Sequence, residues 1–181
     1  ENWKAKGMTM CEIPPIRMLV LTLTGRCNFK CLYCYASEQD PVDMTEETAI
    51  AAVALAHVSK NQFLLQFSGG EPLLQFPLIR KVVDFVEKNH VNAQMQIQTN
   101  GALLTKDIGK WLFDHHVGIG ISCDGRPELM NSLRVSKDGD RSSQKVIQAF
   151  QNLGESNIEA GITCVVTDDT VEQLDGIVDM A

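Results

Sequence analysis

Apolar and polar positions along the chain predict an alternation of strands and helices. Short apolar runs with the length and residue types of strands lie at 18–24, 63–68, 93–99, 117–122 and 159–166. Segments with helix formers or helical apolar spacing lie between them, at 46–58, 78–86, 105–115 and 143–153. Because most of the strands are buried runs rather than alternating ones, this order predicts a parallel sheet with helices outside it.

Capping residues mark where several of these helices begin. Thr45 and Thr105 are good N-caps, and acidic residues follow Thr45 in the first turn, where the helix dipole favours them. Residues 167–169 predict the start of a last helix, which runs to Ala181. Residues 126–141 are expected to form a long polar loop, and loops of this length inside compact domains are often functional.

Two architectures share this order of elements. Repeated βα units can close into a barrel or lie in an open doubly wound sheet, and the pattern alone does not separate them. In both, ligands bind beyond the carboxyl ends of the strands. We treat residues 17–181 as one α/β domain with five βα units, and residues 1–16 as an N-terminal lead-in segment.

Charge and composition exclude some classes of function. The 181 residues carry a net charge of −7, which argues against a general surface for nucleic acid or anionic membranes. We find neither a signal peptide nor an apolar run long enough to span a bilayer, so we expect no membrane partner. Six cysteines without a secretory context fit a reducing compartment, and we expect a cytoplasmic protein.

A cysteine-rich loop follows the first strand and carries the strongest chemical signal. Cys27, Cys31 and Cys34 have the spacing C-x3-C-x2-C. Thiolates are soft ligands for iron and zinc, and an ordinary four-iron cluster takes four cysteines. Three cysteines would leave one iron open, as in metal sites that react. A structural zinc site or cysteines that fill a core are the alternatives, but zinc usually needs four closed ligands, and no His or Cys nearby supplies the fourth.

This loop, with Tyr33 just before the third cysteine, resembles the signature of the radical S-adenosylmethionine (SAM) enzymes. The resemblance implies a [4Fe–4S] cluster whose open iron is chelated by SAM, with Tyr33 among the cofactor-binding residues. It implies that one electron from the cluster cleaves SAM to a 5′-deoxyadenosyl radical, which abstracts a hydrogen atom. For the fold it implies a partial (β/α)6 barrel, with the sixth strand beyond Ala181.

A glycine-rich motif follows the second strand, at the same predicted edge as the cysteine loop. Gly69 and Gly70 would let the backbone approach a ligand closely, and the Glu71 carboxylate could accept hydrogen bonds from an ammonium group. With Pro72 the motif resembles the GGEP motif of the family, which binds the amino group of SAM. The alternative is a tight turn with a surface acid.

Polar residues that end the third and fourth strands, or follow them, also resemble SAM contacts. Asn100 ends the third strand; Ser122 and Asp124 resemble the position that contacts the methionyl or ribose part of SAM. Arg134 lies at the spacing of an arginine that pairs with the SAM carboxylate in related peptide-modifying members, a task that suits a rigid double donor. The alternatives are turn residues for Asn100 and Asp124, and a solvated surface residue for Arg134.

Together the motifs resemble the branch of the family with a C-terminal SPASM or twitch extension, which includes anaerobic sulfatase-maturating enzymes and maturases of ribosomally made peptides. This implies a peptide or protein substrate and an electron donor such as flavodoxin or ferredoxin. It leaves the catalytic residues unassigned. Alternatives are a radical SAM enzyme that acts on a small molecule or RNA, and a non-catalytic iron–sulfur electron-transfer protein.

Overall fold

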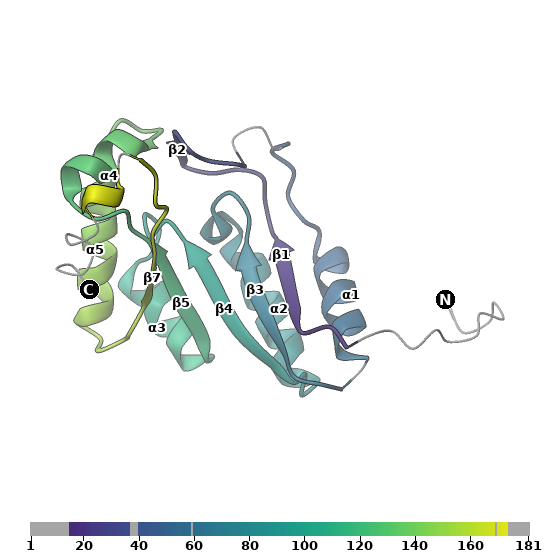
Figure 1. Ribbon diagram of the computed structural model, residues 1–181. Helices are drawn as coiled ribbons and strands as arrows, with labels where there is room; N and C mark the ends of the chain where they lie inside the picture. Colours follow the sequence, from purple (N-terminus) through teal and green to yellow (C-terminus); the bar gives the residue numbers. More distant parts are fainter. Residues whose placement is uncertain (1–14, 37–39, 59, 169, 174–181) are drawn as a thin grey trace.

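A five-stranded parallel sheet forms the centre of the computed structural model, which describes residues 15–36, 40–58, 60–168 and 170–173. Its order is β1-β3-β4-β5-β7 (Figure 1). The strands are β1 (Met18–Thr22), β3 (Phe63–Ser68), β4 (Ala93–Thr99), β5 (Val117–Ser122) and β7 (Gly161–Thr163). The predicted α/β class with parallel strands is confirmed. Residues 1–14 of the expected lead-in, and residues 169 and 174–181 of the expected last helix, lie outside the described residues.

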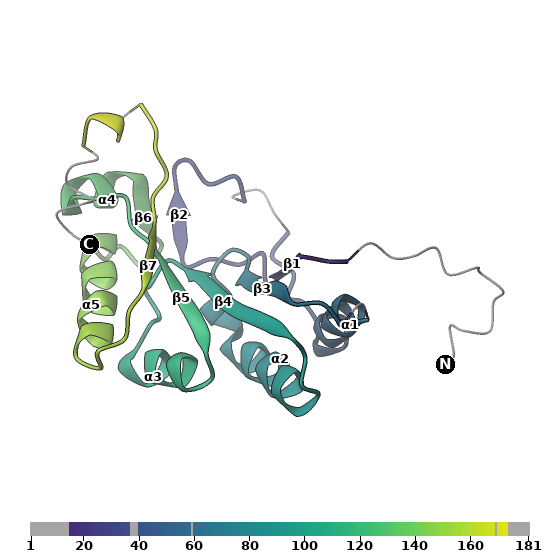
Figure 2. The ribbon, with the colours of Figure 1, turned by 60° about the horizontal axis from the view of Figure 1, so that its bottom comes forward.

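Helices connect these strands and pack on one face of the sheet (Figures 1 and 2). They are α1 (Glu46–His57), α2 (Phe76–Lys88), α3 (Lys106–Asp114) and α5 (Ser142–Gly154), with a 3-10 helix at Pro72–Gln75 before α2. Both predicted N-caps are confirmed, since the side chain of Thr45 accepts from the Thr48 N–H and that of Thr105 from the Ile108 N–H. Each cap satisfies a backbone donor that the helix itself leaves unpaired.

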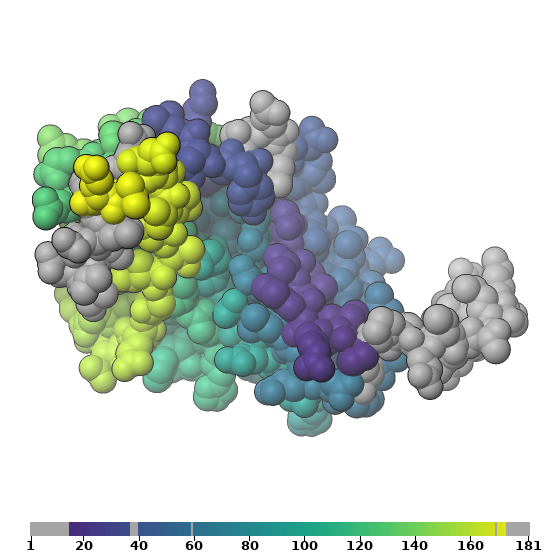
Figure 3. All heavy atoms as spheres, in the orientation of Figure 1, coloured from purple at the N-terminus to yellow at the C-terminus, as the bar shows by residue number. Residues whose placement is uncertain are grey.

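The core lies between the sheet and these helices. Phe63, Leu65 and Phe67 of β3 are buried there, whereas the alternate residues of that strand are partly exposed. β4 and β5 alternate in a similar way. The expectation of strands buried on both faces is therefore wrong. One face of the sheet packs on helices, and the other lines an open concavity, where the central strands lie deeper than the flanking segments (Figure 3).

The segment expected to be a long polar loop is largely ordered. It contains α4 (Pro127–Leu133) and β6 (Arg134–Ser136), so that expectation is wrong. Pro127 suits the first turn of a helix, and Met130 is fully buried. β6 pairs antiparallel with β2 (Phe29–Cys31), which lies inside the cysteine loop. This two-stranded ribbon joins segments about a hundred residues apart in the chain.

The last strand is shorter than expected. β7 ends at Thr163, and the backbone N–H of Val165 donates to a carboxylate oxygen of Asp124 (3.1 Å) instead of a neighbouring strand. Cys164, which falls inside the expected strand, follows β7 and is partly exposed. Cys123, in contrast, is fully buried.

Candidate functional site

The three clustered cysteines lie in the loop that leaves β1, and all of their side chains are partly exposed. Within the described part of the chain, no three His, Cys, Asp or Glu side chains converge on the position of one metal ion. Convergence on one point is what a mononuclear zinc site needs. In a four-iron cluster each cysteine binds a different iron, so such a cluster does not need the three thiols to converge on one point.

Cys27 has two nitrogen donors around its sulfur. Its Sγ accepts from the backbone N–H of Phe29 (3.3 Å) and from the Asn100 side-chain amide (3.7 Å). Burial raises the pKa of the Cys27 thiol, and both hydrogen bonds oppose that rise. Hydrogen bonds to sulfur are one of the ways a protein tunes the potential of an iron–sulfur cluster. Asn100 also donates to Asn28 Oδ1 (2.8 Å), so this amide links the end of β4 to the cysteine loop.

The two glycines of the Gly-Gly-Glu motif pack against the backbone of the cysteine loop. A Cβ on Gly69 would lie 2.5 Å from the Thr24 carbonyl oxygen, and one on Gly70 would lie 2.3 Å from that of Arg26. The Gly70 N–H donates to the Thr24 carbonyl oxygen (2.8 Å). Gly69 also has a φ of +134°, which favours glycine. In this structure the close approach permitted by the glycines is therefore to the loop that holds the cysteines.

The Glu71 carboxylate is fully buried and joins its own loop to the end of β4. Its Oε1 accepts from the Thr99 hydroxyl (2.6 Å) and the Leu73 N–H (3.0 Å), and its Oε2 accepts from the Asn100 N–H (2.8 Å). Burial raises the pKa of Glu71, and these three donors oppose the rise. The alternative of a surface acid is excluded. Glu71 fixes the motif against the end of β4, directly beside the cysteine loop.

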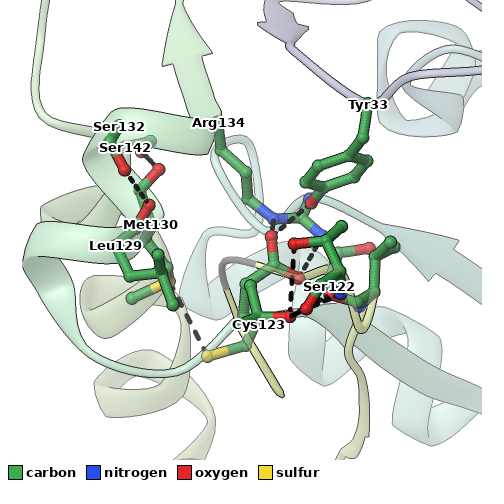
Figure 4. Close-up of polar contacts among 12 residues, drawn as sticks. Tyr33, Ser122, Cys123, Leu129, Met130, Ser132, Arg134 and Ser142 are labelled. Carbon is green, nitrogen blue, oxygen red and sulfur yellow. Dashed lines mark hydrogen bonds and ion pairs between the residues drawn. The ribbon is translucent and has the colours of Figure 1, made fainter. Parts of the chain in front are cut away.

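Asp124 is the centre of a second buried network, at the end of β5. It accepts two hydrogen bonds from Arg134, with distances of 2.7 Å from Nε and 3.1 Å from Nη2. The Tyr33 hydroxyl also donates to it. Figure 4 shows the side chains of Tyr33 and Arg134 converging from different segments. Because Asp124 is 1% exposed and its oxygens are already bonded, its position suits the orientation of Arg134 and Tyr33.

Arg134 is 5% exposed, which excludes the alternative of a solvated surface residue. Its bonds to Asp124 use two of the five N–H donors of a guanidinium group and leave others for an anionic ligand. The guanidinium carbon lies 5.5 Å from the centre of the Tyr33 ring, within cation–π range. Arg134 is also paired with Cys31 across the β2–β6 ribbon. Burial raises the pKa of Cys31 to about 11, and the charge of Arg134 opposes that rise.

Ser122 ends β5 and belongs to a third group, which sequence analysis missed. Its Oγ accepts from the Gln98 side-chain amide (3.0 Å), and the Gln98 carbonyl oxygen accepts from the Thr163 hydroxyl (3.0 Å). The signal for Gln98 was visible in the sequence, because glutamines alternate with Met95, Ile97 and Thr99 along the third strand. A polar face on a strand of a mostly buried sheet indicates a lined cavity or a binding surface.

All of the residues predicted from the motifs therefore lie at the carboxyl ends of the sheet strands or in the segments that follow them. Asn100 contacts the cysteine loop, and Glu71 binds the end of β4 beside it. Tyr33, Asp124 and Arg134 form one cluster, and Ser122 accepts from Gln98. Comparison with known proteins now gives the decisive observation: the model of the radical SAM superfamily matches residues 21–181. The chain belongs to the radical SAM superfamily.

Similar proteins agree with this assignment. The chain is 38% identical over 165 residues to uncharacterized protein MJ0907 of Methanocaldococcus jannaschii, covering 90% of this chain and 57% of that protein. It is 28% identical over 177 residues to a cysteine-type anaerobic sulfatase-maturating enzyme of Clostridium perfringens, covering 91% and 48%. The chain thus spans about half the length of these relatives.

Solved structures show the same architecture. The structure of anSMEcpe with bound AdoMet matches with a TM-score of 0.82 and 26% identity, covering 92% of this radical SAM chain and 48% of that one. Streptococcus suis SuiB bound to S-adenosylmethionine matches with a TM-score of 0.72 and 18% identity, which supports the fold alone. The five-stranded sheet is thus the partial barrel of this superfamily, whose cofactors are a [4Fe–4S] cluster and SAM.

Proposed function

We propose that this chain is the SAM-cleaving core of an enzyme that modifies peptides or proteins. In this proposal Cys27, Cys31 and Cys34 hold the [4Fe–4S] cluster. The SAM-binding residues are Tyr33, Gly69, Gly70, Glu71, Asn100, Ser122, Asp124 and Arg134. With both cofactors bound, the chemistry is one-electron cleavage of SAM to a 5′-deoxyadenosyl radical, which abstracts hydrogen from the substrate.

One observation carries the proposal: a loop with three cysteines packs on the Gly-Gly-Glu motif at the carboxyl edge of a parallel sheet. Gly69 and Gly70 make that packing possible, and Glu71 and Asn100 fix it. A simple electron carrier needs a cluster but has no need for an open, polar barrel face. The chain's own residues would bind SAM, orient its charged groups and keep the reacting end inside the concavity.

The proposal is tested by product formation. Anaerobically reconstituted, reduced protein should convert SAM to 5′-deoxyadenosine, and Cys31→Ala should abolish the conversion. Cys164→Ser is the matched control, because Cys164 lies outside the cysteine loop and should leave the conversion unchanged. A parent protein that holds a four-iron cluster and makes no 5′-deoxyadenosine would point to the electron-transfer alternative.

The peptide or protein substrate is supported by the relatives. The structure of anSMEcpe with AdoMet and Cp18Cys peptide matches with a TM-score of 0.81 and 26% identity. We propose the same broad substrate class for this chain, and we propose that it belongs to the branch of the family with a SPASM extension. We further propose a cytoplasmic location and a flavodoxin- or ferredoxin-like electron donor. No helix among the described residues has the length and apolar character needed to cross a bilayer.

A small-molecule substrate is the second candidate. The Fe-coproporphyrin III synthase of Methanosarcina barkeri is 27% identical over 166 residues, covering 90% of this chain and 41% of that protein. Deuterium transfer separates the two candidates. With cellular fractions from deuterium-grown cells as substrate, label should enter 5′-deoxyadenosine from the peptide fraction. Label from only the small-molecule fraction would favour the second candidate.

A further inference from the structure

The side chain of Gln98 reaches across the neighbouring strand, β5, to a partner on the strand beyond it. It starts on β4, and its side-chain oxygen accepts from Thr163 on β7, although β5 lies between these strands. The residue beside Gln98 on β5 is Gly120, which in turn is paired with Gly161 on β7. A Cβ on Gly120 would lie 2.5 Å from the Gln98 Oε1. The glycine therefore provides the space in which the Gln98 amide lies.

The chemistry of the three groups gives this chain of hydrogen bonds a direction. The Gln98 Oε1 is a carbonyl oxygen and can only accept, so the Thr163 hydroxyl donates to it. The Gln98 Nε2 can only donate, so the Ser122 Oγ accepts from it. A hydroxyl that accepts still has its own proton to donate. In the part of the chain that the structure describes, Gln98 is the one hydrogen-bond partner of the Ser122 hydroxyl.

We propose that Gln98 is a positioning residue, held by Thr163, which makes the Ser122 hydroxyl a hydrogen-bond donor to an acceptor oxygen of bound SAM. This inference rests on the proposed function, because it takes Ser122 as a SAM contact. It adds that the Ser122 proton points away from Gln98 and toward an acceptor on SAM, either the carboxylate or a ribose oxygen. It also gives a role to Gly120, without which the amide could not reach β7.

Gln98→Glu tests the direction of the relay. A carboxylate at this position can only accept, so it would take the Ser122 proton for itself and leave SAM facing an oxygen lone pair. We expect the dissociation constant of SAM, measured by equilibrium dialysis on the cluster-reconstituted protein, to rise about 10- to 100-fold. Thr163→Val removes the hydroxyl that holds the Gln98 amide in one orientation, and it should weaken SAM binding severalfold. Thr163→Ser keeps that hydroxyl and should bind SAM like the parent.

Gln96→Glu is the matched control. Gln96 lies on the same face of β4, two residues before Gln98, and it donates to Gln66 (2.9 Å) rather than to Ser122. The Gln96→Glu variant adds the same charge to the concavity as Gln98→Glu does. It therefore shows how much of the loss of SAM affinity comes from repulsion between a carboxylate and SAM. Thermal unfolding of each variant without cofactors separates a loss of SAM binding from a loss of fold.

A second ligand identifies the acceptor oxygen. If Ser122 donates to the carboxylate, Gln98→Glu should weaken SAM far more than decarboxylated SAM; equal weakening assigns a ribose oxygen. Binding of SAM to Gln98→Glu with parent affinity, or equal weakening by Gln96→Glu, would overturn the inference and leave the proposed function intact. A cluster-loaded parent that does not bind SAM would overturn both.

Discussion

Single residues at this site act mainly by joining segments that lie far apart in the sequence. Glu71 accepts hydrogen bonds from the end of β4 and from its own loop, and Asp124 joins Tyr33, Arg134 and the Val165 backbone. Both carboxylates are almost completely buried. A buried charge is stable only when its hydrogen bonds are made, so the loss of one donor has a measurable cost.

Thr99→Val removes one donor to Glu71 without a change in side-chain shape. We expect the free energy of unfolding to fall by about 1–3 kcal/mol, because a buried carboxylate loses a hydrogen bond of 2.6 Å. Chemical denaturation of the cofactor-free protein measures this. Thr22→Val, at an exposed position of β1, is the control and should change stability by less than about 0.5 kcal/mol. Equal effects would contradict a special role for Glu71.

The raised pKa of Glu71 predicts a pH dependence. Because burial raises the folded-state pKa above the unfolded value, the folded state binds the proton more tightly. The stability that this proton contributes is complete below the pKa of Glu71 in the unfolded chain, about 4.3. It is lost as pH rises through the pKa of Glu71 in the folded protein. Glu71→Gln cannot titrate. The difference in unfolding free energy, parent minus variant, should therefore fall as pH rises through this window; a constant or rising difference would contradict the assignment.

Asp124→Asn breaks a buried ion pair. Arg134 would keep its charge in a site that is 6% exposed, and such a break costs about 3–5 kcal/mol of stability. The exposed pair of Arg26 and Asp43 provides the comparison, because its side chains are 48% and 40% exposed. Asp43→Asn should therefore cost much less stability than Asp124→Asn. Similar losses of unfolding free energy for the two variants, measured with denaturant, would contradict the special importance of Asp124 for the stability of the site.

At the scale of elements, the cysteine loop is held by two neighbours: the Gly-Gly-Glu turn and strand β6. The sequence indicated the first, because the motif is local and follows a clear strand. It did not indicate the second. β2 and β6 have three residues each and are stabilised by pairing with each other, a long-range contact that local pattern does not reveal. The alternation of Gln94, Gln96 and Gln98 is a local signal of a polar face that sequence analysis did not use, and one partner of Gln98, Thr163, lies two strands away.

Gly70→Ala tests the packing of one element on the other. The added methyl would lie 2.3 Å from the Arg26 carbonyl oxygen. This clash can be relieved only by a shift of the backbone, which costs stability. We expect a loss of about 1–3 kcal/mol in stability and reduced iron content after reconstitution. Gly154→Ala is the control, since nothing lies within 4 Å of its added Cβ. It should reconstitute like the parent.

The described part of the chain is a half-open barrel, and the edge at which we propose that the cofactors bind is built from several separate segments. The α/β class with parallel strands could be predicted because βα units repeat, whereas the choice of a partial barrel over an open sheet came from the family resemblance of the motifs at the strand ends. The degree of burial on the inner face could not, because it depends on how far the sheet closes. That face is lined by polar side chains, among them Gln66, Gln98 and Thr163. This explains why strands that the sequence pattern predicted to be buried are exposed on one side.

Binding of SAM at a cluster held by the three cysteines is the central claim. Electron paramagnetic resonance of the anaerobically reconstituted, reduced protein, recorded with and without SAM, tests it most directly. We predict a four-iron signal that changes when SAM is added. A four-iron signal indifferent to SAM would contradict SAM binding, and the absence of any cluster, with Cys31→Ala indistinguishable from the parent, would contradict the assignment of the cysteines.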